Sequence, residues 1–326
     1  LSLLRSILED EKLRKVEIQC LFVSILAKMA IMNDIKAAIM RAGLIETVCS
    51  TLRNNSTDAA CSIQCADALS AISKQQDEVK AFIAKNLSTL NPLELLTQAL
   101  RYFAENEELA KSAATALWSI AYKNVALKAS AGKSGAFILL CSAARMHRTK
   151  LHVLPHIFVA LGNLCANHGP NQLEAGRSDI VATCLEFLTE HIESPTMVFA
   201  ILNCLNSLIS GELEGQDVNH AAFLAAGGQA VLDECAEHHS STAKVMSLCA
   251  AIQESLEDGK TQAEAALKER QKKENLTVLE AQELAVCQPH SAWCRIDKRE
   301  RTTAMRGPKE LHVKHKKGRA TTPQTV

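Results

Sequence analysis

The sequence predicts an all-α fold in which similar helical units stack into a solenoid of about five to six repeats. One observation behind this prediction is a six-residue apolar pattern that recurs at nearly constant spacing. A second is that apolar residues such as Leu109, Ala113, Ala116 and Ile120 lie three and four apart, which is typical of amphipathic helices. No segment shows sustained apolar–polar alternation between turn signals, so essentially no sheet is expected.

The recurring pattern is a small or apolar residue, Leu, any two residues, Ile, Leu or Met, and another small or apolar residue. It occurs at 25–30, 68–73, 116–121, 160–165 and 204–209, with a degenerate copy around Leu248. The leucines lie at positions 26, 69, 117, 161, 205 and 248, at separations of 43, 48, 44, 44 and 43. A period in the low forties is the length of a solenoid unit of two or three helices.

The segments between the copies predict two further helices in each unit. A short first helix ends near glycine in several units, as in 33–43, 124–135 and 218–228, because glycine readily takes the left-handed conformation that closes a helix. A second helix is predicted at 44–53, 92–103, 136–146, 180–191 and 229–238. The third helix carries the recurring pattern, and Pro155 should bend or restart one of these helices.

Three regions follow from this organisation. Residues 1–259 form the solenoid, whose first repeat is incomplete, because 1–10 match a second helix and 11–32 a third. Residues 260–294 are rich in Glu, Lys, Gln and Ala and are expected to form a charged helical cap or linker. Residues 295–326 contain ten Lys or Arg against three Asp or Glu and few large apolar residues, so a basic disordered tail is expected.

The composition indicates in which cellular compartment the protein is expected. The chain has 36 Lys plus Arg, 36 Asp plus Glu and 12 Cys, and most cysteines fall inside apolar helical runs, including Cys61 and Cys65 on one helix face. Such cysteines behave as small apolar side chains. No apolar run is long enough to span a membrane and no secretory leader is present at Leu1, so a reducing, cytoplasmic location is expected. A nuclear location and a cytoskeletal or ciliary location are the alternatives.

A unit with a glycine turn and a closing helix such as 116–121 or 160–165 resembles the armadillo repeat family. HEAT repeats have a similar period but two helices, and the short first helix ending at glycine favours armadillo. The resemblance implies a right-handed superhelix whose third helices line a concave groove for extended peptides or whole proteins. It therefore implies a non-catalytic protein-binding scaffold.

The groove differs from that of importin-alpha, in which a Trp stands two residues before the repeated Leu and an Asn two after it. Only Asn163 matches this pattern, so a nuclear-import receptor is not expected. Trp118 is the outstanding candidate for a binding contact, because Trp is enriched at interface hot spots. The groove candidates are Thr115, Trp118, Ser119, Val159, Asn163, Asn203, Asn206 and Ser207. The alternative is that these side chains pack or hydrogen-bond within the solenoid.

No pattern points to catalysis, a cofactor or a metal. The segment 131–135 (Ala-Gly-Lys-Ser-Gly) lacks the first glycine of a phosphate-binding loop and is interpreted as a helix-ending turn. His147, His152 and His156 lie near one junction, but such histidines are common at helix starts. Cys287, His290, Cys294, His312 and His315 fit no zinc-finger spacing. The chain is therefore not expected to be an enzyme.

The basic tail leaves a second hypothesis open. Lys314, Lys316, Lys317 and Arg319 could contact an anionic lattice such as a microtubule, which would make the chain a structural component of a filament or ciliary assembly. The same tail could serve as a nuclear address or occupy the chain's own groove. No aromatic residue interleaves with these charges, which argues against specific nucleic-acid recognition.

Overall fold

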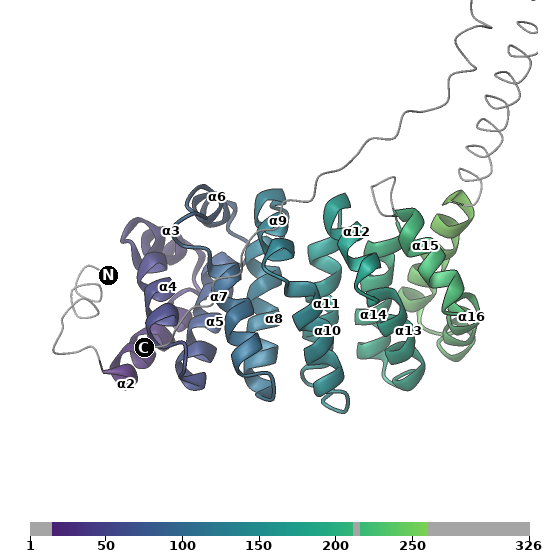
Figure 1. Ribbon diagram of the computed structural model, residues 1–326, viewed down its shortest axis with the longest axis horizontal. Helices are drawn as coiled ribbons and strands as arrows, with labels where there is room; N and C mark the ends of the chain where they lie inside the picture. The colour runs from purple at the N-terminus through teal and green to yellow at the C-terminus, as the bar shows by residue number, and fades with distance from the viewer. Residues whose placement is uncertain (1–14, 211–215, 260–326) are drawn as a thin grey trace, which may run out of the picture. The chain divides into compact units, whose positions relative to one another are not determined.

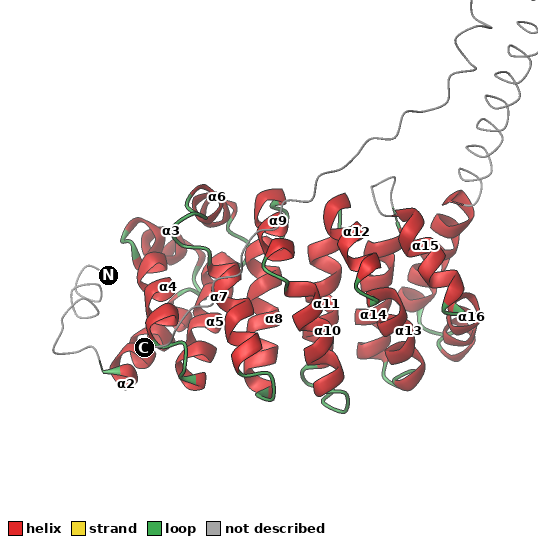
Figure 2. Ribbon diagram, viewed as in Figure 1, coloured by secondary structure: helices red, strands yellow, loops and turns green. Residues whose placement is uncertain are grey.

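The computed structural model describes residues 15–210 and 216–259, and the account below is confined to them. The chain divides into two units, residues 1–263 and 264–326, and the second lies entirely outside the described residues. Within the first unit the helices stand side by side in a row that follows chain order from α2 to α16 (Figure 1). All regular structure in the described ranges is helical (Figure 2), so the predicted all-α fold is confirmed.

Each repeat that follows α2 in the described residues contains the three predicted helices. The short first helices are α3 (Asn33–Arg41), α6 (Asp77–Lys85), α9 (Val125–Lys133), α12 (Gly169–Arg177) and α15 (Gln216–Ala225). The second helices are α4 (Leu44–Asn54), α7 (Pro92–Tyr102), α10 (Ala136–Met146), α13 (Ile180–Glu190) and α16 (Gly228–His238). The third helices are α2 (Val16–Met29), α5 (Ala59–Ser73), α8 (Glu107–Ala121), α11 (Leu154–Cys165) and α14 (Pro195–Ile209). Residues 243–259 are the helical third segment of the last repeat.

The turn between first and second helices uses one left-handed residue in every described repeat. Gly43, Gly135 and Gly227 have φ values of 71°, 80° and 71°. Asn91 and Asp179 take the same place at φ 28° and 54°, because short polar side chains tolerate this region better than most residues. The helix α9 ends at Lys133, with Ser134 and Gly135 following as the turn, so the segment 131–135 ends a helix, as interpreted.

The one irregular separation, 48 residues, has a local cause. Two residues join the first and second helices in four repeats, at 42–43, 134–135, 178–179 and 226–227. Between α6 and α7 the connection is longer and runs from Asn86 to Asn91. The extra residues lie in this loop, so they leave the stacking of the third helices unchanged.

The recurring leucines form the core of the stack. Leu26, Leu69, Leu117, Leu161 and Leu205 are each at most 1% exposed, and the third helices that carry them pack on one another in sequence, α2 on α5, α5 on α8, α8 on α11 and α11 on α14. Cys61 and Cys65 are fully buried in the same layer, which matches their predicted role as packing residues. Each unit therefore buries its apolar face against its neighbours.

Buried polar side chains close the ends of the third helices. Lys36 on α3 donates to the Lys74 carbonyl at the end of α5 over 2.7 Å, and Lys128 on α9 donates to the Ala166 carbonyl at the end of α11. At the matching position of α12, Gln172 donates to the Ser207 carbonyl. A cation at a helix C-terminus satisfies free carbonyls and complements the helix dipole. Burial lowers the pKa of Lys36 and Lys128.

Histidines link successive second helices. His147, His191 and His239 each follow the end of a second helix, and their Nε2 atoms lie 3.0, 3.1 and 2.7 Å from the carbonyls of Ala104, Arg148 and Ile192 in the preceding repeat. Because a carbonyl only accepts, Nε2 donates in each pair. These contacts join neighbouring units at the opposite end of the second helix from the glycine turn.

No single helix of the described ranges is long and apolar enough to cross a membrane. The pair α9 and α10 passes the same length and composition test only when taken together, and the two helices are bent by 67°. Leu127, Phe137 and Leu140 of this pair are at most 1% exposed within the core.

Candidate functional site

The candidate site is the face made by the adjacent third helices, which we call the third-helix surface. Helices α8, α11 and α14 lie in order along it (Figure 1), and the helical segment 243–259 follows in the last repeat. Every predicted groove residue lies on α8, α11 or α14. The structure distributes these residues among three different environments.

Four of the predicted residues meet in one hollow between α11 and α14. Val159 and Asn163 come from α11, and Asn203 and Ser207 come from α14. The hollow has a volume of about 210 Å³. Successive positions four apart lie on the same side of a helix, which is why the two pairs face each other across adjacent helices.

The two asparagines of this hollow are oriented by their own helices. Asn163 donates from Nδ2 to the Val159 carbonyl over 2.9 Å, and Asn203 donates from Nδ2 to the Phe199 carbonyl over 2.7 Å. With Nδ2 turned back to the helix, each Oδ1 points away from it. Among the described residues, neither Oδ1 accepts a hydrogen bond that would close it to a ligand. Both side chains are half-buried, so each offers a fixed acceptor at the surface.

Thr115 and Trp118 on α8 are held by local contacts. The Thr115 hydroxyl lies 3.0 Å from Nδ1 of His156 on α11 and donates to the Lys111 carbonyl. Burial lowers the pKa of His156, with Lys111 and His152 adding to the effect. Trp118 is half-buried against the core and meets Tyr122 edge to face, with ring centroids 6.3 Å apart. Trp118 therefore packs against the core of the solenoid and leaves part of its side chain exposed to solvent.

Two predicted groove residues differ from the expectation. Ser119 is only 1% exposed and its hydroxyl lies 3.1 Å from that of Ser70 on α5, so it joins two third helices and is not part of the accessible surface. Asn163 and Ser207 occupy the same position two residues after the repeated Leu but are half-buried, so this position alone does not decide burial. Asn206 is half-buried and accepts a hydrogen bond from Ser210 at the end of α14. The side-chain oxygen Oδ1 of Asn206 therefore already accepts a hydrogen bond within the chain, unlike Oδ1 of Asn163 and of Asn203.

Two residues that the sequence did not single out shape this hollow. Phe199, one turn before Asn203, is 43% exposed and lines it. Gly162 forms its floor, because a Cβ at this position would lie 2.9 Å from Cα of Cys204. The available signals were the spacing of four from Asn203 and the glycine inside a predicted helix, where glycine is otherwise unfavourable.

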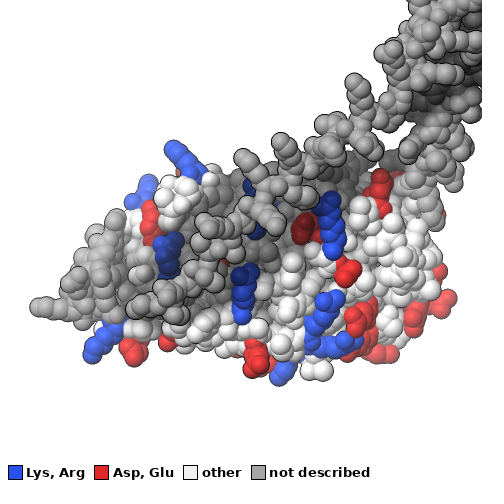
Figure 3. Space-filling view, viewed as in Figure 1, with Lys and Arg blue, Asp and Glu red and all other residues white. Residues whose placement is uncertain are grey.

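Charge is distributed unevenly along the solenoid. Between residues 15 and 179 the sequence has 17 Lys or Arg and 13 Asp or Glu. Between 180 and 259 it has 12 Asp or Glu and one basic residue, Lys244. On the face in Figure 3, acidic side chains gather over the part of the row occupied by α13 and α16. The hollow between α11 and α14 is itself lined by uncharged side chains.

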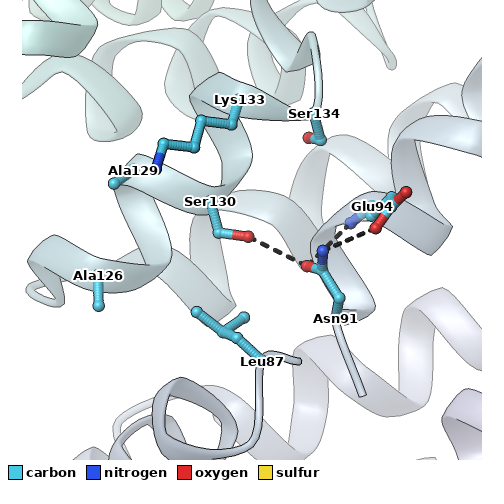
Figure 4. A pocket seen from close by; sticks show the side chains of 8 residues that line it. All are labelled: Leu87, Asn91, Glu94, Ala126, Ala129, Ser130, Lys133 and Ser134. Atoms are coloured by element: carbon cyan, nitrogen blue, oxygen red, sulfur yellow. Dashed lines mark hydrogen bonds between the residues drawn. The ribbon is translucent and has the colours of Figure 1, made fainter. Parts of the chain in front are cut away.

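A larger hollow of about 350 Å³ lies away from the third helices, between the start of α7 and α9 (Figure 4). Its polar groups bind one another: Ser130 donates to Oδ1 of Asn91 over 3.0 Å, and Asn91 donates to Glu94 over 2.8 Å. Lys133 and Glu94, also on its wall, are exposed to solvent. Because these partners already satisfy one another, the arrangement does not point to a reaction.

The residues weighed as metal ligands do not form a metal site within the described residues. The described part of the chain contains no group of three or more His, Cys, Asp or Glu side chains placed to hold a metal ion. His147 and His156 bind different partners, the Ala104 carbonyl and Thr115. The tail residues Lys314, Lys316, Lys317 and Arg319 lie outside the described residues, as do Cys287, His290, Cys294, His312 and His315.

Solved structures share this architecture. One is an engineered protein from the Northeast Structural Genomics Consortium, with a TM-score of 0.67 and 21% sequence identity over 78% of this chain and 97% of that one. A designed armadillo repeat protein in complex with the peptide (KR)4 matches with a TM-score of 0.65 and 17% identity, covering 78% and 99% of the two chains. A second designed armadillo repeat protein matches at 0.66 and 16%, with the same coverage. The chain folds as an armadillo-like solenoid.

At these identities the likeness concerns the fold of the armadillo-like solenoid alone. No protein-family model matches the sequence, and comparison with curated proteins gives no match. The likeness to the solved structures confirms the predicted three-helix repeat as a fold. The binding role of the third-helix surface has to be argued from its own residues.

Proposed function

We propose that this chain is a non-catalytic scaffold that binds an extended segment of another protein along its third-helix surface. The observation that carries the proposal is the hollow between α11 and α14, where two oriented amide oxygens, of Asn163 and Asn203, face outward. An extended segment presents backbone N–H groups along its edges, and each needs an acceptor when water is displaced.

Pre-organisation favours such binding. Because Nδ2 of Asn163 and Asn203 is already bonded to the helix backbone, little side-chain freedom is lost when Oδ1 accepts a hydrogen bond. Trp118 is similarly restrained by Tyr122. A rigid aromatic side chain with an exposed face contributes contact area at low entropic cost.

The chemistry of the described residues favours a scaffold over an enzyme. Histidines that would be candidate acids or bases are committed to structural contacts, as His147 is to the Ala104 carbonyl and His191 to the Arg148 carbonyl. The armadillo-like neighbour that was solved with a peptide supports peptide binding as a use of this architecture. Its (KR)4 ligand does not transfer to this chain, because the α11–α14 hollow has no acidic residue to pair with Lys or Arg.

Site-specific photocrosslinking tests the proposal. A benzoylphenylalanine at Ser207 in the full chain should capture a partner from native extract, identified by mass spectrometry. The same group at Ile138, which is 62% exposed on the second helix α10, is the matched control. Asn203→Ala and Trp118→Ala should weaken capture while circular dichroism shows an intact fold. Equal capture from Ser207 and Ile138, or unchanged capture by both variants, contradicts the proposal.

A further inference from the structure

The exposed ring of Phe199 stands between two hollows of the third-helix surface. On one side is the α11–α14 hollow described above. On the other is a second hollow of about 310 Å³ between α14 and the segment 243–259, lined by Thr196, Thr242 and Val245 among others. Phe199 lines both, and 43% of its surface is exposed. One aromatic side chain therefore forms the wall common to two neighbouring hollows.

The exposed apolar surface extends beyond this ring. Val159, half-buried on α11, lines the first hollow, and Val245 of the following helical segment lines the second. Apolar side chains from three successive third helices thus lie along one stretch of the surface. Contiguous exposed apolar surface rimmed by polar groups is typical of a protein-interaction site.

Charge separates this stretch from the other end of the third-helix surface. The hollow beside α2 and α5, of about 450 Å³, is lined by Lys36, Asp67 and Lys74. The two hollows beside Phe199 have no acidic lining residue, and Lys244 is their one charged residue. A Lys or Arg side chain entering beside Phe199 would lose hydration without meeting an acidic partner, whereas an apolar side chain carries no such cost.

We infer that the two hollows beside Phe199 bind two bulky apolar side chains of an extended partner segment, one in each hollow. This inference rests on the proposed function and specifies which chemistry the third-helix surface selects. The segment is uncharged where it meets Phe199, and its backbone lies against the amide oxygens of Asn163 and Asn203.

A phage-displayed library of random short peptides, selected on the full chain, tests the inference. Selected peptides should be enriched in pairs of Leu, Ile, Met or Phe. By fluorescence polarisation with a labelled selected peptide, Phe199→Ser should weaken binding about tenfold or more, as expected for a central aromatic contact. Thr196→Arg, a change at an exposed residue of the second hollow, should weaken it similarly without touching the core. Ile138→Ser on α10 should leave binding unchanged.

The outcomes separate this inference from the proposed function. If Asn203→Ala weakens binding but Phe199→Ser and Thr196→Arg do not, the scaffold proposal stands and the apolar selection is wrong. Selected peptides that carry Lys and Arg, or Asp and Glu, in place of the expected pair of apolar residues also overturn the inference. If no peptide is selected by the wild-type chain, both the inference and the proposed function fail. Thermal unfolding followed by circular dichroism establishes that each variant is folded.

Discussion

The Thr115 hydroxyl on α8 lies 3.0 Å from Nδ1 of His156 on α11, linking two neighbouring third helices across 41 residues of sequence. The same register recurs one repeat earlier, where the Asp67 carboxylate on α5 interacts with Ser112 on α8 and burial raises the pKa of Asp67. In both pairs a residue two before the repeated Leu meets a residue five before the next one. Lateral polar contacts thus set how adjacent third helices align.

The Thr115–His156 contact predicts a pH dependence of stability. Burial lowers the pKa of His156 in the folded chain, so the unfolded state binds its proton first as pH falls. The contribution of His156 is fully present above its unfolded pKa of about 6.5 and is lost as pH falls toward the lower folded value. Chemical denaturation of wild type and His156→Asn from neutral to mildly acidic pH measures this.

The comparison with His156→Asn is needed because burial also lowers the pKa of His168. The wild type should lose more free energy of unfolding on acidification than the variant. Parallel pH profiles for the two proteins would show that His156 makes no such contribution.

Lys128 should stabilise the end of α11. Its ammonium donates to the Ala166 carbonyl, and hydrogen bonds that involve a charged group contribute more than neutral ones. Lys128→Met keeps the apolar stem but removes the donor, so the free energy of unfolding should fall by about 1–2 kcal/mol. Lys133→Met, at an exposed position of the same helix, is the matched control and should have little effect. Similar urea midpoints for both variants would contradict the capping role.

Gly162 should be required for the close approach of α11 and α14. A Cβ there would lie 2.9 Å from Cα of Cys204, which is backbone and cannot rotate away. Alanine would gain about 1 kcal/mol of helix propensity, but overpacking against a backbone costs about 1–3 kcal/mol. We therefore expect Gly162→Ala to lower the free energy of unfolding, measured by chemical denaturation. Ser207→Ala, which adds no bulk to the same hollow, should be tolerated; a stabilised Gly162→Ala would mean that the helices separate freely.

His191 should couple two successive repeats. Its Nε2 donates to the Arg148 carbonyl over 3.1 Å, and its ring packs 5.8 Å from that of Phe187. His191→Leu should reduce the free energy of unfolding by about 1 kcal/mol, because the Arg148 carbonyl loses its donor. His152→Leu, whose side chain is about half exposed, is the control for losing a surface imidazole. Equal thermal midpoints for wild type and His191→Leu would refute the coupling.

Several elements could be predicted from sequence because their signals are local. The second helix at 136–146 was predicted with its observed bounds, since glycine precedes it and its apolar residues repeat at helical spacing. Gly43, Gly135 and Gly227 marked turns that do adopt positive φ. Asn91 and Asp179 take the left-handed position of the same turn in the other two repeats. Glycine alone therefore predicted the turn in three repeats and missed it in two.

The candidate site was harder to predict because it depends on which residues face one another across helices. The structure brings together four of the predicted groove residues, Val159, Asn163, Asn203 and Ser207. Ser119 is also a predicted groove residue but is buried beside Ser70, whereas Asn163 at the equivalent position of the next repeat is half-buried. Phe199 was missed, since an apolar residue on an apolar helix carries no sign of whether it faces the core or the solvent.

By itself, the sequence determined the repeat. A period in the low forties and helical spacing of apolar residues require units that cannot bury their apolar faces alone, and stacking is the consequence. The tertiary structure alone decided which side chains the stack leaves uncovered. Whether Asn163 and Phe199 face outward while Ser119 faces inward depends on the rotation and register of one helix against its neighbour, which arise from side-chain packing between residues about forty positions apart.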